Sequence, residues 1–338
     1  MALTVARRLA AAVLAAAALG AAPVMAQSSI SAEVDVSAGT STENVRAGST
    51  QARLFGATAS DWRFLTEVNY AGVDGQRSDA FSAAYPYDRR VRFMEVYGEK
   101  MFRPRRYLLG LKGGRYRTPF GIFNRSDHAY TGFIRAPLIR YGTSFALSNT
   151  FLEGGVDLVA GLPQLYVETS LGVPQDEGVA KRRDGLDGTV RVQGYYKSLN
   201  VGASRLHSGR DRNLSAFAKG RMVFNGIDAR WMARGVQVRG EWMFGHPFSA
   251  VDTTGGYVDL IVHHRNLGPV TLVARAERLD YDALQDRFDL FLHRFTAGAR
   301  VRVLQSLAVQ INVIHQPTGL AAGRRNVLDA GLTYTLRR

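Results

Sequence analysis

The chain has 338 residues, with 43 lysines and arginines against 29 aspartates and glutamates, a formal net charge of +14 and no cysteine. The missing cysteines exclude a disulfide-stapled domain, thiolate metal sites and cysteine nucleophiles. The length suits one large domain or two average ones. Among the basic residues, 38 are arginine and five are lysine. This arginine bias has two alternative explanations. One is codon usage in a GC-rich genome, and the other is anion recognition by the planar, always charged guanidinium.

The first 26 residues have the pattern of a secretory signal. Arg7 and Arg8 are followed by an alanine-rich apolar run at residues 9–22, then by Pro23 and a small residue, Ala26, at the expected cleavage point. A membrane anchor is the alternative, but the run is shorter than the roughly 20 residues that a spanning helix needs. A twin-arginine signal is not supported by the residues after Arg8. We therefore predict a signal peptide at 1–26 and a mature chain at 27–338 with a net charge of +12.

After residue 26 every long apolar stretch is interrupted by charge, as Asp157 interrupts residues 151–160. A mature chain that crosses a bilayer must then cross it as strands. Backbone groups in lipid need partners within the protein, and only helices and closed barrels provide them.

Apolar and polar residues alternate with a period of two along much of the chain, which is the pattern of strands with two different faces. The segments with this alternation are 30–36, 62–70, 189–193, 236–244, 270–277, 294–301, 307–313 and 328–336. Their polar faces hold charges in mid-strand, which a polar lumen accommodates and lipid does not. These charges are Arg191, Arg239, Glu241, Arg275 and Glu277.

Aromatic residues gather towards the ends of these segments. They are Trp62, Tyr70, Tyr107, Tyr116, Tyr195, Tyr196, Trp231, Trp242 and Phe244. Interfacial girdles of a membrane barrel require that placement, although the ordinary β-propensity of aromatic residues also produces it.

Connections alternate between short and long. The short ones are 59–61, 224–226, 266–268 and 304–306, and the long ones 72–89, 118–142, 174–185, 207–213, 246–255, 280–290 and 316–325. Outer-membrane barrels alternate short turns with longer loops in this way, and roughly 20 residues per strand and connection give about 16 strands. We predict an all-β fold: a transmembrane antiparallel up-and-down barrel of 16 to 18 strands around an aqueous channel.

Three segments resemble the phosphate-selective porin O/P family. They are Gly114-Arg115-Tyr116-Arg117-Thr118-Pro119-Phe120-Gly121, Val238-Arg239-Gly240-Glu241-Trp242-Met243-Phe244-Gly245 and Arg275-Ala276-Glu277-Arg278-Leu279-Asp280. The similarity is patchy and runs from about residue 95 to residue 336. It implies a 16-stranded barrel, a homotrimer, and one loop folded into the lumen, which corresponds here to residues 118–142. It also implies basic ladders that pass phosphate or other oxyanions.

The basic residues of the expected lumen wall and inward loop are the candidate anion-selecting residues. They are Lys112, Arg115, Arg117, Arg135, Arg140, Arg191, Arg239, Arg275 and Arg300. A ring of fixed positive charge concentrates anions and repels cations. The alternative is that each cation pairs with a lumen carboxylate such as Glu241 or Glu277.

No metalloprotease, nucleophile-elbow or phosphate-loop motif is present, and we expect no enzyme, cofactor or metal. Asp127 and His128 of the inward loop leave a barrel hydrolase of the protease or lipase type as one alternative, and a structural or adhesin barrel as another. Arginines spread over many strands do not form the single patch of a nucleic-acid-binding protein. The predicted function is an anion-preferring porin of the outer membrane, exported through the periplasm, with lipid, lipopolysaccharide and small anionic solutes as partners.

Overall fold

A computed structural model describes residues 29–74, 89–103, 106–122, 131–140, 152–175, 183–211, 221–248, 251–283, 290–317 and 325–338. The predicted signal peptide lies outside this part of the chain. Within it, no helix is long and apolar enough to cross a membrane.

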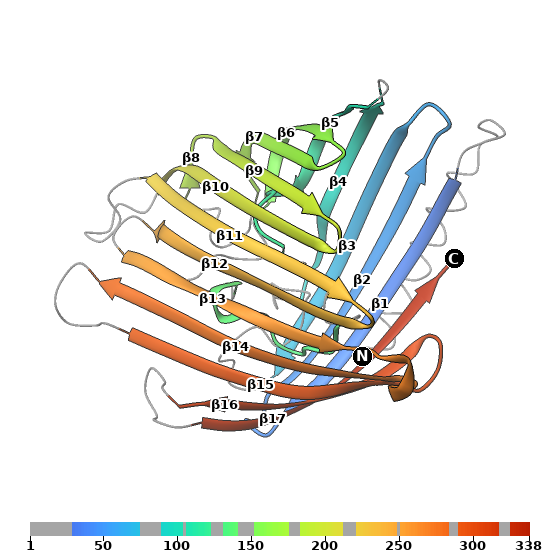
Figure 1. The fold of residues 1–338 in the computed structure, drawn as a ribbon, viewed down its shortest axis with the longest axis vertical. Helices are drawn as coiled ribbons and strands as arrows, with labels where there is room; N and C mark the ends of the chain where they lie inside the picture. The colour runs from blue at the N-terminus through green and yellow to red at the C-terminus, as the bar shows by residue number, and fades with distance from the viewer. Residues whose placement is uncertain are drawn as a thin grey trace.

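Nearly all the described residues lie in strands (Figure 1). The first nine strands are β1 (Ser29–Ser41), β2 (Arg46–Ala57), β3 (Trp62–Asp74), β4 (Val91–Phe102), β5 (Leu108–Arg117), β6 (Leu152–Leu162), β7 (Leu165–Pro174), β8 (Arg183–Asp184) and β9 (Asp187–Tyr196). The remaining strands are β10 (Leu199–Asp211), β11 (Arg221–Ala233), β12 (Val236–Phe248), β13 (Val251–Val262), β14 (Val270–Ala283), β15 (Leu290–Arg302), β16 (Leu307–Gln316) and β17 (Arg325–Arg337). Two 3-10 turns, η1 (Leu138–Arg140) and η3 (Arg265–Leu267), complete the elements named here.

Each long strand pairs antiparallel with the next, and β17 pairs with β1, so the sheet closes on itself. The two-residue β8 pairs only with the end of β10, while β9 pairs with both β7 and β10. The barrel therefore has 16 full-length strands, which confirms the predicted fold class. Closure gives every full-length strand a partner on each side, as a bilayer requires.

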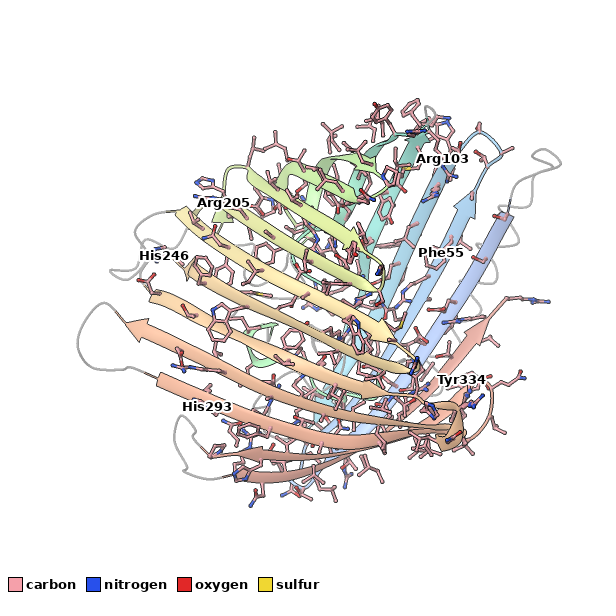
Figure 2. All side chains as sticks on the ribbon, in the orientation of Figure 1. Phe55, Arg103, Arg205, His246, His293 and Tyr334 are labelled. Carbon is pink, nitrogen blue, oxygen red and sulfur yellow. The ribbon has the colours of Figure 1, made fainter. Side chains whose placement is uncertain are left out.

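The predicted alternation becomes two faces of one sheet. On β12, Arg239, Glu241 and Met243 are buried inside the ring, whereas Trp242 and Phe244 are exposed on the outer surface. The same rule orders most strands, so charged and polar side chains line the interior and apolar side chains form the outer band. Side chains project from both faces of the barrel wall (Figure 2). Soluble sheets do the reverse, and this inversion is what a membrane barrel requires.

Short and long connections alternate around most of the ring, but the expected long connection at 246–255 is wrong, because β12 runs to Phe248 and β13 begins at Val251. Connections 58–61, 103–107, 163–164, 197–198, 234–235, 263–269 and 303–306 lie at one end, which we call the turn end. The opposite end, the loop end, carries the connections after β1, β3, β5, β7, β10, β12, β14 and β16.

The expected turn at 224–226 is wrong, because β11 runs through Gly226 without a break. Gly226 faces the lumen, where a Cβ atom would lie 2.9 Å from the ring of Phe120. The glycine makes room for an aromatic ring of the inward loop, and the real turn is at Gly235, where φ is 81°.

Most of the expected girdle residues lie on the outer surface. The exposed ones are Trp62, Tyr107, Tyr195, Tyr196, Trp231, Trp242 and Phe244, and Tyr70 is half-buried. Tyr116 is the exception, with an exposed fraction of 1%. It lies four residues after Lys112 on the same strand, so the period of two puts both on the lumen face.

Candidate functional site: the lumen and its inward loop

The connection after β5 turns into the barrel, as predicted for residues 118–142. Its first part crosses to β10–β12, where the backbone N–H of Gly121 donates to Ser204 Oγ at 3.2 Å and that of Ile122 donates to Glu241. The ring of Phe120 packs against Phe224, with centroids 6.2 Å apart. Residues 118–122 are therefore attached to the lumen face of β10–β12.

An apolar cluster inside the barrel joins this loop to the wall. Its loop members are Phe120, Leu138 and Ile139, and its wall members are Leu206, Phe224, Met243, Tyr257, Leu279 and Leu292. The sequence carried a signal for it that we did not use, because towards the loop end the lumen-facing positions change from charged to apolar. On β14 the change runs from Arg275 and Glu277 to Leu279.

The second part of the loop, residues 131–138, lies along β13–β17. Asn312 fixes it twice: Oδ1 accepts the N–H of Ile134 at 2.7 Å, and Nδ2 donates to the carbonyl of Gly132 at 3.0 Å. Gly132 has a φ of 101°, and a Cβ atom there would lie 2.9 Å from Cβ of Arg300. Only glycine allows the loop to approach the wall this closely.

Arg135 anchors the loop by charge. Its guanidinium forms two hydrogen bonds with Asp329, at 2.5 and 2.9 Å, and reaches Ser41 at 3.2 Å and Glu43 at 3.1 Å. Arg135 has an exposed fraction of 5%. A bidentate pair of this kind fixes geometry as well as charge, and here it joins the loop to β17 and to the connection after β1.

Two wall arginines bind the loop backbone. Arg275 donates to the carbonyl of Arg135 at 3.0 Å while it pairs with Asp259 at 2.6 and 2.9 Å. Arg294 donates to the carbonyl of Ala136 at 2.5 Å while it pairs with Glu277. Each guanidinium therefore satisfies a loop carbonyl that a buried backbone segment must otherwise leave unpaired.

We call the lumen faces of β10–β17, on which the loop lies, the covered wall. Two further contacts belong to it. The Phe133 ring lies 4.0 Å from the guanidinium carbon of Arg275, and Arg239 shares the carboxylate of Asp259 at 3.0 Å. The sequence analysis did not select Arg294, although it lies on a segment with clear alternation and is 1% exposed.

Four of the predicted anion-selecting residues are thus buried in ion pairs. Arg135, Arg191, Arg239 and Arg275 have exposed fractions of 2–5%. Arg191, on β9, pairs with Asp228 at 2.8 Å and also donates to Ser204. Their geometry matches the alternative in which each cation pairs with a lumen carboxylate, and these contacts stabilise the wall and the loop.

The opposite side of the lumen differs, and we call it the facing wall: the lumen faces of β3–β7. Lys112 pairs there with Asp157 at 2.5 Å and with Glu168 at 3.4 Å. Arg117 pairs with Glu67 and, at 2.9 Å, with Glu95.

In three of these facing-wall pairs the cation is the more exposed member, while Lys112 and Glu168 are equally exposed, at 14% and 15%. The Arg117 side chain is 21% exposed, against 1% for Glu67 and 9% for Glu95. Lys112 is 14% exposed and Asp157 0%. Glu67, Glu95 and Asp157 are thus more buried than their partners, and Arg117 is the most exposed charge of these pairs.

Three predicted residues remain to be placed. Arg115, half-buried at the loop end of β5, donates to the carbonyl of Gln175 at 3.2 Å. Arg300 is half-buried on β15 beside Gly132 of the loop. Arg140 belongs to η1, but its side chain lies outside the described part of the structure.

The geometry offers no metal centre within the described residues, since no group of three or more histidines and carboxylates there is placed to hold an ion. Asp127 and His128, the alternative hydrolytic pair, lie outside the described residues.

Solved structures with similar folds are outer-membrane proteins. OmpF of Salmonella typhi in complex with daunomycin superposes with a TM-score of 0.62 at 13% identity, over 91% of this chain and 97% of that one. OprB of Pseudomonas putida gives 0.63 at 10%, over 92% and 94%. A loop L8 deletion mutant of OmpT, an outer membrane protein of Vibrio cholerae, gives 0.60 at 12%, over 91% and 99%.

At these identities the similarity shows the fold alone: a porin-like barrel. No family model matches the sequence, and no curated protein does. The resemblance to the phosphate-selective family stays a prediction.

Proposed function

We propose that this protein is an outer-membrane porin through which small hydrophilic solutes diffuse passively. The observation that carries the proposal is the inversion of the closed 16-stranded sheet, with ionic side chains inside and apolar side chains outside. Barrels of about 16 strands are wide enough for an aqueous channel. The inward loop narrows that channel from the covered wall.

Anion preference is the finer part of the proposal. The facing wall supports it, because Arg117 is more exposed than both carboxylates that hold it and Lys112 is more exposed than Asp157. The predicted mature chain also has a net charge of +12. Phosphate and other oxyanions suit such a wall, because guanidinium forms bidentate hydrogen bonds with them.

The outer membrane as location follows from the apolar outer band, and export through the periplasm from the predicted signal peptide. A homotrimer belongs to the same proposal. One of the similar structures, OmpT of Vibrio cholerae, is described in a trimer form. Lipid and lipopolysaccharide are then the partners of the outer surface.

Planar-bilayer recording tests the function. In a gradient of potassium chloride we expect stepwise open channels with a reversal potential on the anion side, and a preference that weakens as ionic strength rises. Folded protein without conductance contradicts the porin and favours a structural or adhesin barrel. Hydrolysis that is lost on Asp127→Asn or His128→Gln favours the enzyme alternative.

A further inference from the structure

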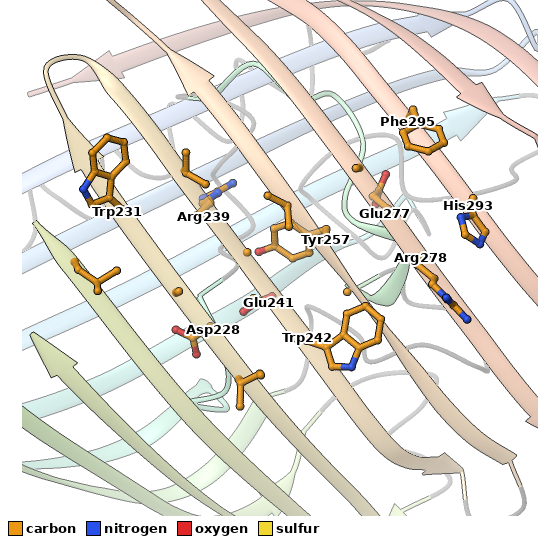
Figure 3. Close-up of a pocket in the computed structure, with 18 residues that line it drawn as sticks. Asp228, Trp231, Arg239, Glu241, Trp242, Tyr257, Glu277, Arg278, His293 and Phe295 are labelled. Atoms are coloured by element: carbon orange, nitrogen blue, oxygen red, sulfur yellow. The ribbon is translucent and has the colours of Figure 1, made fainter.

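The outer surface of the barrel carries a groove of about 600 Å³ across β10–β15 (Figure 3). Its floor consists of small residues, Ala229, Gly240, Gly256 and Ala276. Large apolar side chains surround the floor: Leu199, Ile227, Trp231, Val238, Trp242, Val258 and Phe295. Pockets of this volume suit small molecules, and this one opens onto the surface that meets lipid.

The strand register produces the groove. One cross-strand row contains Ile227, Trp242, Gly256, Arg278 and His293, on five successive strands. A Cβ atom on Gly256 would lie 2.7 Å from Cε3 of Trp242, so the indole leans over the glycine.

The next row towards the turn end is mostly small. It contains Ala229, Gly240, Val258, Ala276 and Phe295. Small residues aligned on neighbouring strands leave a channel that bulky neighbours border.

Charge on the outer lining of the groove is confined to one end. Arg278 and His293 face each other across β14 and β15, on the side nearer the loop end. The Arg278 side chain is 47% exposed, and its Nε donates to Asp280 Oδ2 at 2.6 Å. That bond orients the guanidinium, which has five N–H donors in all. At the turn end of the groove the lining is apolar, with Trp231 and Leu199.

We propose that this groove binds one anionic lipid of the outer leaflet, with an acyl chain on the Gly240–Gly256 floor and its phosphate at Arg278 and His293. The proposal rests on the outer-membrane location. Apolar burial favours the chain in the groove, and arginine forms charge-assisted hydrogen bonds with phosphate. Arg278 and His293 lie on the side nearer the loop end, where headgroups of that leaflet meet the barrel.

Native mass spectrometry of the full-length folded protein tests this site. Detergent-solubilised protein is titrated with dimyristoyl phosphatidylglycerol or dimyristoyl phosphatidylcholine, and retained lipid is counted. We expect one tightly retained phosphatidylglycerol and at least threefold less phosphatidylcholine. Arg278→Gln should remove that preference, and Ala276→Leu, which fills the floor, should lower retention of both lipids at least threefold.

Matched variants make the test specific. Ala297→Leu adds the same side chain to an exposed lipid-facing position outside the groove. Arg205→Gln removes a charge from the outer face of β10 near the loop end (Figure 2). Both should retain lipid as the unaltered protein does.

Equal retention in all variants overturns the proposal, as does loss of an oligomer in Ala276→Leu, which assigns the groove to a second copy of the chain. Conductance separates this result from the porin proposal. Ala276 and Arg278 lie outside the lumen, so channel activity should persist in both variants whatever the lipid result.

Discussion

The covered wall and the facing wall both carry ion pairs, but the cations of these pairs differ in exposure. On the covered wall both members of a pair are hidden: the side chains of Arg294 and Glu277 are 1% and 0% exposed. On the facing wall Arg117 is 21% exposed above a Glu67 that is 1% exposed. An arginine in a polar lumen is therefore not by itself a solute-binding residue, and the position of the inward loop decides which role it has.

The physical reason lies in desolvation. A fully buried ion pair gains little over apolar packing, because removing both charges from water is costly. The covered-wall arginines make a second set of bonds, to the carbonyls of Arg135 and Ala136, which the loop needs once water is displaced. Their fixed geometry therefore holds the loop in place, while Arg117 on the facing wall stays 21% exposed.

Loss of Asp259 should have the largest effect, because this one carboxylate holds both Arg239 and Arg275. Asp259→Asn removes the carboxylate that these two buried guanidinium groups share. Breaking a buried pair costs about 3–5 kcal/mol, and we expect a loss of this size in the free energy of unfolding. Urea titration of the folded barrel in micelles measures it.

An exposed pair provides the control for this variant. Asp74 and Arg89 form an ion pair with side chains 73% and 59% exposed. Asp74→Asn should cost less than about 1 kcal/mol, as exposed pairs do. Equal costs for the two variants would remove the distinction between buried anchors and exposed charges.

A smaller effect is expected from Asn312→Leu, which removes both hydrogen bonds to the loop. Two bonds of about 0.5–1.5 kcal/mol each place the loss between about 1 and 3 kcal/mol. The loop should loosen before the barrel does, so limited proteolysis within residues 118–142 and single-channel current noise should both increase.

Gln310 is the matched control, two residues away on the same lumen face. Its Nε2 donates to Thr333 Oγ1 at 3.1 Å, a contact within the wall. Gln310→Leu should leave loop proteolysis and current noise unchanged. If both variants loosen the loop alike, Asn312 is not its specific anchor.

The sequence was sufficient for the fold because the evidence for strands is local. Alternation in segments such as 236–244 identifies each strand and its two faces without knowledge of its neighbours. The partners of Asp259 could also be predicted in part, because Arg239 and Arg275 are its direct cross-strand neighbours. Assigning them requires the register of two hairpins, and the seven-residue connection 263–269 does not fix that register from its length alone.

The anchoring of the loop was not predictable in the same way. Arg135 meets Asp329 across 194 positions of sequence, and that contact depends on the path of the loop through the lumen. Exposure depends on the same path, so the buried and the partly exposed members of the predicted arginine set look alike in the sequence. The apolar lumen positions Met243 and Leu279 were the local sign that part of the wall is covered.

Arg117→Gln should have the smallest effect on stability and a specific effect on selectivity. Glu67 keeps Arg53, whose Nε lies 3.2 Å from it, and Glu95 keeps the hydrogen bond from the backbone N–H of residue 117 at 3.1 Å. Removing this partly exposed charge should lower the chloride-to-potassium permeability ratio about twofold. Such a change corresponds to an electrostatic energy difference of order RT for a passing ion. Reversal potentials at low salt measure that ratio.

The conservative and distant variants decide what such a shift means. Arg117→Lys keeps the charge and should keep the ratio, whereas Arg205→Gln removes the same charge from the outer face and should not change it. If Arg117→Gln and Arg205→Gln shift the ratio equally, net charge alone sets selectivity and the facing wall has no special role. If only Arg117→Gln shifts it, the exposed member of a lumen ion pair is the group that a passing anion meets.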